Sequence, residues 1–125
     1  MNVKDIIEKV DYLKPNDYTE EDKIMWFKTI EAKIWQEIIL THVKPDGLHM
    51  YPLDLDSTPF AIKYSENENQ FVDLYVYYLM AMIDKANEEI ERYINQIALF
   101  NNEYQLFSNY WHNKYMPIYK GQFII

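Results

Sequence analysis

The sequence predicts a mainly α-helical fold, a small bundle of about four to five helices in one domain over residues 1–125. From Phe71 to Met116 the chain contains neither Pro nor Gly. Apolar residues recur there at steps of three and four, which place them on one stripe of a helix. Two shorter stretches nearer the N-terminus show the same spacing. Apolar residues make up 49% of the chain, which is enough for a core and too many for a disordered protein.

The first predicted helix covers residues 3–13. Its apolar face consists of Val3, Ile6, Ile7 and Val10. Asn2 can cap its N-terminus, and Asp5 is favourably placed in the first turn, where the helix dipole attracts negative charge. A Pro-Asn-Asp turn at residues 15–17 follows.

The second predicted helix follows Thr19 and runs to about Leu40. Thr19 and Asp22 have the spacing of a capping box, with Asp in place of the usual Glu. Trp26 and Trp35 widen the apolar face. The face itself consists of Ile24, Phe27, Ile30, Ile34 and Ile38.

Residues 42–69 are predicted to form one long irregular loop. Three of the five Pro residues and one of the two Gly residues lie in it. Asp46-Gly47 suits the turn of a short β-hairpin, and residues 61–64 suit a short strand. Loops of this length in small domains are often functional or ordered by a partner.

The stretch without Pro or Gly would make one helix about 69 Å long, but a domain of this size is only about 35–40 Å across. The stretch is therefore predicted to break. Asn101-Asn102 is the preferred point and Asn87 the second candidate, because Asn tolerates the left-handed conformation. The expected helices are residues 70–100 and 102–115. Pro117 stops the second of them and begins an extended apolar tail, residues 117–125.

Composition excludes several classes of function. The chain has 12 basic and 20 acidic residues, a net charge of −8, and Arg92 is its only Arg. Without a basic patch, tight nucleic-acid binding is not expected. The absence of Cys excludes disulfides and thiolate chemistry. The longest apolar run, residues 74–83, is about half a membrane span and no signal peptide is visible, so we expect a soluble protein without membrane contact.

No constellation typical of catalysis or metal binding is visible. The three histidines, His42, His49 and His112, match no metal-ligand spacing. We interpret the first two as polar loop residues, and His112 as a favourable cation near a helix C-terminus. Residues 54–65 begin like a calcium loop but lack its Gly and its final Glu. We therefore predict no enzyme, no cofactor, and no catalytic or metal-binding residue.

Three tyrosines in the long stretch leave two interpretations open. Tyr75 and Tyr78 share a helical face, and Tyr77 points about 160° away from Tyr75. Either the helix is central and buried all round, or its second face contacts another subunit.

The helical stretches also carry a set of residues that occur together in one group of proteins. They are Glu21-Asp22-Lys23-Ile24, Trp26, Asp73-Leu74-Tyr75, Tyr77-Tyr78-Leu79, Ala81, Ile83-Asp84, Asn87, Arg92-Tyr93, Phe100-Asn101, Tyr104, Phe107 and Met116-Pro117. In these residues the chain resembles the head–tail connector (head completion, or adaptor) proteins of tailed bacteriophages and prophages of Gram-positive bacteria. Ile94 departs from the pattern, where Asn is expected. The resemblance covers neither residues 42–69 nor the tail.

The resemblance implies a structural protein of the virion neck, present in the host cytoplasm during assembly. Connectors form a ring of twelve subunits under the portal, extend the DNA channel and provide a docking surface for the stopper or tail terminator. DNA passes through such a ring without specific binding. The alternative is a helical regulatory or binding protein encoded by a phage or prophage, a soluble monomer or dimer.

We expect contacts with such partners from the loop, the tail and the second face of the central stretch. Apolar and aromatic side chains there suit an interface, and the tail could add a strand to a partner's sheet. The candidates are Tyr77, His49, Tyr51, Phe60, Ile62, Tyr64, Ile118, Tyr119, Phe123, Ile124 and Ile125.

Overall fold

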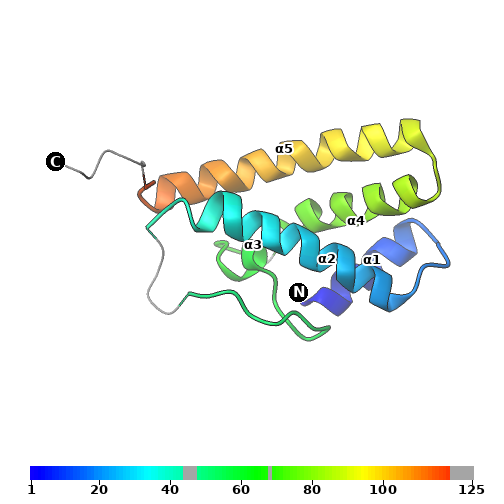
Figure 1. Ribbon diagram of the computed structural model, residues 1–125, viewed down its shortest axis with the longest axis horizontal. Coiled ribbons are helices and arrows are strands. Elements are labelled where there is room, and N and C mark those ends of the chain that lie inside the picture. Colours follow the sequence, from blue (N-terminus) through cyan, green and yellow to red (C-terminus); the bar gives the residue numbers. More distant parts are fainter. Residues whose placement is uncertain (44–47, 68, 119–125) are drawn as a thin grey trace.

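The computed structural model is helical, as predicted, and describes residues 1–43, 48–67 and 69–118. No strand occurs in these ranges (Figure 1). The elements are α1 (Val3–Leu13), α2 (Glu20–Ile34), the π-helical turn η1 (Trp35–Ile39), α3 (Phe60–Lys63), α4 (Val72–Ala86) and α5 (Ile90–Lys114). None of the helices in the described ranges has the length and apolarity that crossing a membrane requires.

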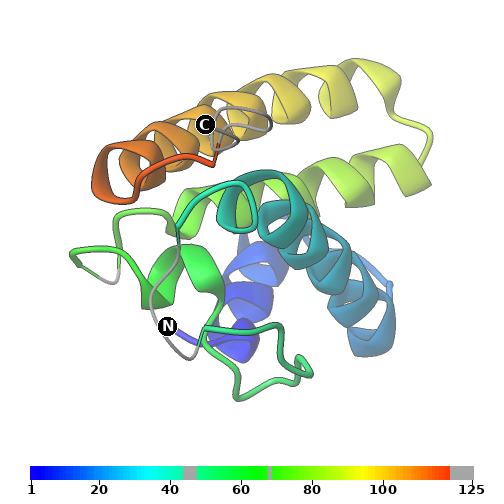
Figure 2. The same cartoon turned by 60° about the vertical axis from the view of Figure 1, so that its left-hand side comes forward.

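Helix α4 is the centre of the bundle. It runs antiparallel to α5 on one side and contacts α1 and α2 on the other (Figures 1 and 2). Tyr75 is fully buried, whereas Tyr77 and Tyr78 are partly buried. The side chains that α4 buries are Val72, Leu74, Tyr75, Val76, Leu79, Ala81, Ile83 and Asp84. The interpretation of a central helix is therefore supported, with partial exposure on the side of Tyr77.

The N-terminal caps of α1 and α2 form as the sequence predicts. The Asp5 backbone N–H donates to Asn2 Oδ1 over 2.9 Å, and Asn2 N–H donates back to the Asp5 carboxylate over 3.1 Å. Thr19 and Asp22 make the equivalent pair over 3.1 and 3.4 Å. These side chains satisfy backbone groups that the helix itself cannot pair, and so fix where each helix begins.

The preferred break point at Asn101-Asn102 is wrong, and the second candidate, Asn87, is correct. Helix α4 ends at a Schellman motif: Glu88 N–H donates to the Lys85 carbonyl, and Glu89 N–H to the Asp84 carbonyl. Glu88 is left-handed there, with φ 60°. Asn101 and Asn102 remain inside α5 with exposed side chains. Their side-chain amides can therefore bond water and need not compete for the helix backbone.

The predicted strand at residues 61–64 is also wrong, because residues 60–63 form the short helix α3. Phe60, Ala61 and Ile62 all lie in the core. Asp46 and Gly47, the expected hairpin turn, lie outside the described residues. The last described residue, Ile118, lies just beyond η1 in space, and its backbone N–H donates to the Thr41 carbonyl over 2.7 Å.

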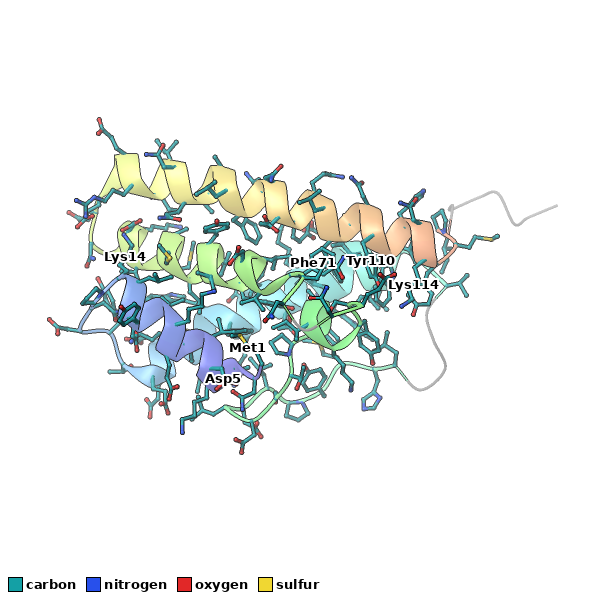
Figure 3. All side chains as sticks on the ribbon, turned by 180° about the vertical axis from the view of Figure 1, so that it is seen from behind. Met1, Asp5, Lys14, Phe71, Tyr110 and Lys114 are labelled. Atoms are coloured by element: carbon teal, nitrogen blue, oxygen red, sulfur yellow. The ribbon has the colours of Figure 1, made fainter. Side chains whose placement is uncertain are left out.

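Polar and aromatic contacts join the helix ends (Figure 3). The Lys14 ammonium, after α1, lies 2.6 Å from the buried Asp84 carboxylate at the end of α4. At the opposite end of α4, the Phe71 and Tyr110 rings have centroids 5.3 Å apart, and Lys114 donates to the Tyr110 hydroxyl over 3.3 Å.

The irregular segment 48–59 runs over α2 and α1 and leads into α3.

Candidate functional site

Glu31 on α2 is a buried carboxyl group at the centre of the molecule's polar interior. Its side chain is buried with 1% of the residue exposed. The Tyr75 hydroxyl donates to Glu31 Oε1 over 2.6 Å, and the Phe60 backbone N–H donates to Oε2 over 3.1 Å. The Tyr51 hydroxyl lies 3.5 Å from the same Oε2. Glu31 thereby joins α2, α4, α3 and the segment before α3.

Glu31 and Tyr75 together act as the N-terminal cap of α3. Pro59 precedes this helix and supplies no side-chain cap of its own. The first backbone N–H, from Phe60, reaches Glu31, and the second, from Ala61, donates to the Tyr75 hydroxyl over 2.9 Å. Helix ends leave such N–H groups unpaired, and a buried unpaired donor is costly. The carboxyl is thus an anchor that holds the end of the loop against α2.

Burial determines the proton affinity of this group. Loss of water raises the pKa of Glu31 to about 7, although the hydrogen bonds from Tyr75, Phe60 and Tyr51 lower it in part. Burial and the nearby Glu31 carboxyl also raise the pKa of Tyr75 and of Tyr51. A carboxyl of this kind is common at functional sites. Here, however, protein donors occupy both oxygens, which favours the structural role.

A groove lies on the outer side of Glu31, between α2 and residues 50–56. It consists of two adjoining cavities of about 320 and 650 Å³ that share Lys28 and Leu53. We call it the α2 groove. Its apolar lining includes Ile24, Met25, Met50, Pro52, Leu53 and Leu55. Its carboxylates are Glu21, Asp54, Asp56 and, at the buried end, Glu31.

The segment that forms the outer wall of the groove is fixed by its own hydrogen bonds. The Tyr51 hydroxyl donates to the Thr58 carbonyl over 2.6 Å. Ser57 Oγ donates to Asp54 Oδ1 over 3.1 Å and accepts from the Asp54 N–H over 3.0 Å. Val3 and Lys4 of α1 donate their backbone N–H groups to the carbonyls of Ser57 and Leu55. Strong internal bonding makes this wall a formed surface.

A second polar cluster lies where η1 meets α5. His42 lies outside the helices, as expected of a loop residue, but it is buried, with 8% of the residue exposed. His42 Nδ1 donates to the Ile38 carbonyl over 2.6 Å, because a carbonyl can only accept. Its Nε2 then faces His112 Nδ1 at 3.3 Å. In the described parts of the chain, no three His, Cys, Asp or Glu side chains gather in a group that could hold a metal ion.

The predicted partner contacts fall into three groups. Phe60 and Ile62 lie in the core, 1% and 4% exposed, so their side chains contact the rest of this chain rather than the surface. Tyr51, Tyr64 and Tyr77 are partly buried, and His49 and Ile118 are exposed. The remaining candidates, Tyr119, Phe123, Ile124 and Ile125, lie outside the described residues.

The sequence contained a signal for Glu31 that the apolar pattern obscured. Glu31 lies between Phe27 and Ile34 at steps of four and three, which places a carboxyl in the middle of the apolar stripe of α2. A charged residue there needs internal partners. The groove gave no comparable signal, because its two walls are far apart in sequence and meet only in the fold.

Comparisons of the chain with protein-family models, with curated protein sequences and with solved structures found no match.

Proposed function

We propose that this protein is a structural subunit of a bacteriophage neck, which assembles with itself into a ring between the portal and the stopper or tail terminator. The resemblance in the helical stretches carries the phage assignment. One structural observation supports self-assembly: the N-terminal half of α5 is covered on one side only and leaves apolar side chains in water.

The exposed part of α5 is the section from Ile90 to Leu99. The side chains that α5 buries completely, Phe100, Phe107 and Trp111, all follow it. Ile90 and Ile94 are 58% and 57% exposed, and Leu99 is exposed as well. Burying such a side chain contributes about 1.5–3 kcal/mol. A neighbouring subunit that covers this section therefore gains several kcal/mol, the kind of driving force that an obligate assembly uses.

The charge of the chain is compatible with a DNA channel. Net charge is −8, and like charge lets a polyanion pass without adhering to the wall. This point supports passage of DNA and excludes no other role.

A second candidate function has its own support. The α2 groove is the kind of apolar cleft with polar edges that binds a ligand or peptide. A regulatory or binding protein encoded by a phage or prophage, a monomer or dimer, would use it directly. The two functions differ in the size of the assembly, since the ring needs this section of α5 covered in every subunit and needs association beyond a dimer when portal is present.

A substitution on α5 separates the two. Ile94→Lys places a charge on the exposed section without removing a core side chain. We expect it to weaken self-association at least tenfold, because burying a charge in an apolar contact costs more than about 1.4 kcal/mol. Sedimentation velocity of the purified chain with and without the portal protein of the same phage measures this.

The matched control is Asn95→Lys, which adds the same charge one residue along, at a position that is already polar and exposed. The connector proposal requires the control to assemble like the unchanged chain. Equal behaviour of both variants, or no association in any of the three proteins, would contradict it.

A further inference from the structure

The α2 groove is an apolar surface that the described chain leaves open. Met25, on its α2 wall, is 64% exposed, and Met50, on the opposite wall, is 41% exposed. Methionine side chains are flexible and polarisable, and they are common on surfaces that bind peptide segments. Glu21, Asp54 and Asp56 place three carboxylates along the groove, and Lys28 places one ammonium. The groove therefore suits a largely apolar segment that carries positive charge.

A segment of that composition follows the last described helix. Residues 118–125 read Ile-Tyr-Lys-Gly-Gln-Phe-Ile-Ile, with Lys120 as the only charged side chain. Ile118, the last described residue, is 49% exposed. The segment would leave several large apolar side chains in water if nothing bound it, at about 25 cal/mol for each Å².

We propose that the α2 groove of one copy binds residues 118–125 of a neighbouring copy. The inference rests on the proposed assembly and names one contact that would hold it together. Lys120 would face the carboxylates of Asp54, Asp56 and Glu21, and the aromatic and aliphatic side chains would cover Met25 and Met50.

The point where the segment begins lies away from the Met25 part of the groove. Ile118 is bonded to Thr41, beyond the C-terminal end of η1. Met25 is sixteen helical positions earlier, about 24 Å away along the axis.

The positions of segment and groove also fit a ring. The segment leaves from the end where η1 and α5 meet, and the Met25 part of the groove lies near the other end of α2 (Figure 1). A contact between two different surfaces is heterologous, and repeated heterologous contacts close into rings. The proposal therefore gives the direction in which subunits would follow one another.

A photo-crosslinking peptide tests the contact on the full chain. The peptide spans residues 118–125 with a benzoylphenylalanine at the position of Phe123. We expect its adducts to lie on residues 21–28 and 50–56, as located by mass spectrometry of the digested protein. A Lys120→Glu version of the peptide should label about tenfold less, because it adds charge repulsion, and Asp56→Lys in the protein should restore labelling.

Two protein variants serve as matched probes. Met25→Lys alters the groove wall and should reduce labelling about tenfold, whereas Met116→Lys alters a side chain that is 68% exposed outside the groove and should leave it unchanged. Circular dichroism of each variant verifies that the helices are intact. Adducts elsewhere, or equal labelling by a peptide of scrambled sequence, would overturn the proposal.

Sedimentation of the same samples distinguishes this proposal from the function on which it rests. Assembly with portal but no groove labelling leaves the ring in place and removes the tail contact. Groove labelling with a chain that stays monomeric at every concentration, with or without portal, contradicts the contact between copies and the ring together.

Discussion

At the scale of single residues, Glu31 determines how the irregular half of the chain is attached to the helices. One carboxyl group accepts the first backbone N–H of α3, the hydroxyl of Tyr75 and, at longer range, that of Tyr51. Because α3 lacks a cap of its own, removing this acceptor leaves buried donors unpaired. The sequence placed Glu31 on the apolar stripe, but only the fold supplies its partners, since they come from three other segments.

The raised pKa of Glu31 leads to a prediction about stability and pH. A folded-state pKa of about 7 against 4.5 for an ordinary Glu means that the folded state holds the proton more tightly. Its contribution to stability is therefore full below pH 4.5 and is lost as pH rises through 7. Relative to Glu31→Gln, which cannot ionise, the unchanged chain should lose about 3 kcal/mol of unfolding free energy between pH 4 and pH 8. Urea denaturation of both proteins across that range measures the difference.

Glu37, which lies in the π-helical turn η1, provides a control of opposite sign. The hydrogen bond from Lys33 lowers the pKa of this exposed carboxyl. Its contribution is present above pH 4.5 and is lost as pH falls. The difference in unfolding free energy between the unchanged chain and Glu37→Gln should accordingly grow with pH. If the difference in unfolding free energy between the unchanged chain and Glu31→Gln does not vary with pH, then Glu31 is not protonated in the folded state.

At the scale of elements, the sequence predicted helix starts better than helix breaks. The starts of α1 and α2 followed from Asn2 and Thr19, because a cap is a local arrangement of side chain and backbone. The break between α4 and α5 depended on tertiary structure. Antiparallel packing of the two helices brings Phe100 to Tyr78, with ring centroids 5.2 Å apart, and this pairing requires the turn at residues 87–89. Asn101 and Asn102, equally permissive locally, stay helical.

The turn between α4 and α5 contains a residue that is not adapted to its backbone. Glu88 is left-handed, the conformation that Gly adopts without steric cost. Glu88→Gly should therefore stabilise the fold by about 0.5–1 kcal/mol, net of the greater freedom of Gly in the unfolded chain. Thermal or urea denaturation measures it. Ala98→Gly, on the exposed side of α5, is the comparison and should destabilise by about 1 kcal/mol. A loss of stability in both variants would mean that Glu88 makes a contact worth more than its strain.

At the scale of the whole molecule, periodicity was sufficient for the bundle and insufficient for its surfaces. Apolar stripes at helical spacing indicate what must be buried, and a central helix follows when one stretch is apolar on several sides, as in α4. The α2 groove arises because α3 and the segment before it are held over α2 by contacts between distant residues, and no local pattern encodes that. The exposed section of α5 was equally hidden, since Ile90 and Ile94 continue the helical stripe that elsewhere enters the core.

The mass of the purified chain in solution, measured by light scattering with and without portal protein, tests the central proposal most directly. The account predicts a complex of ring size when portal is present, and weaker assembly for Ile94→Lys than for Asn95→Lys. A chain whose mass stays that of a monomer or dimer at every concentration, whether or not portal is added, would contradict it.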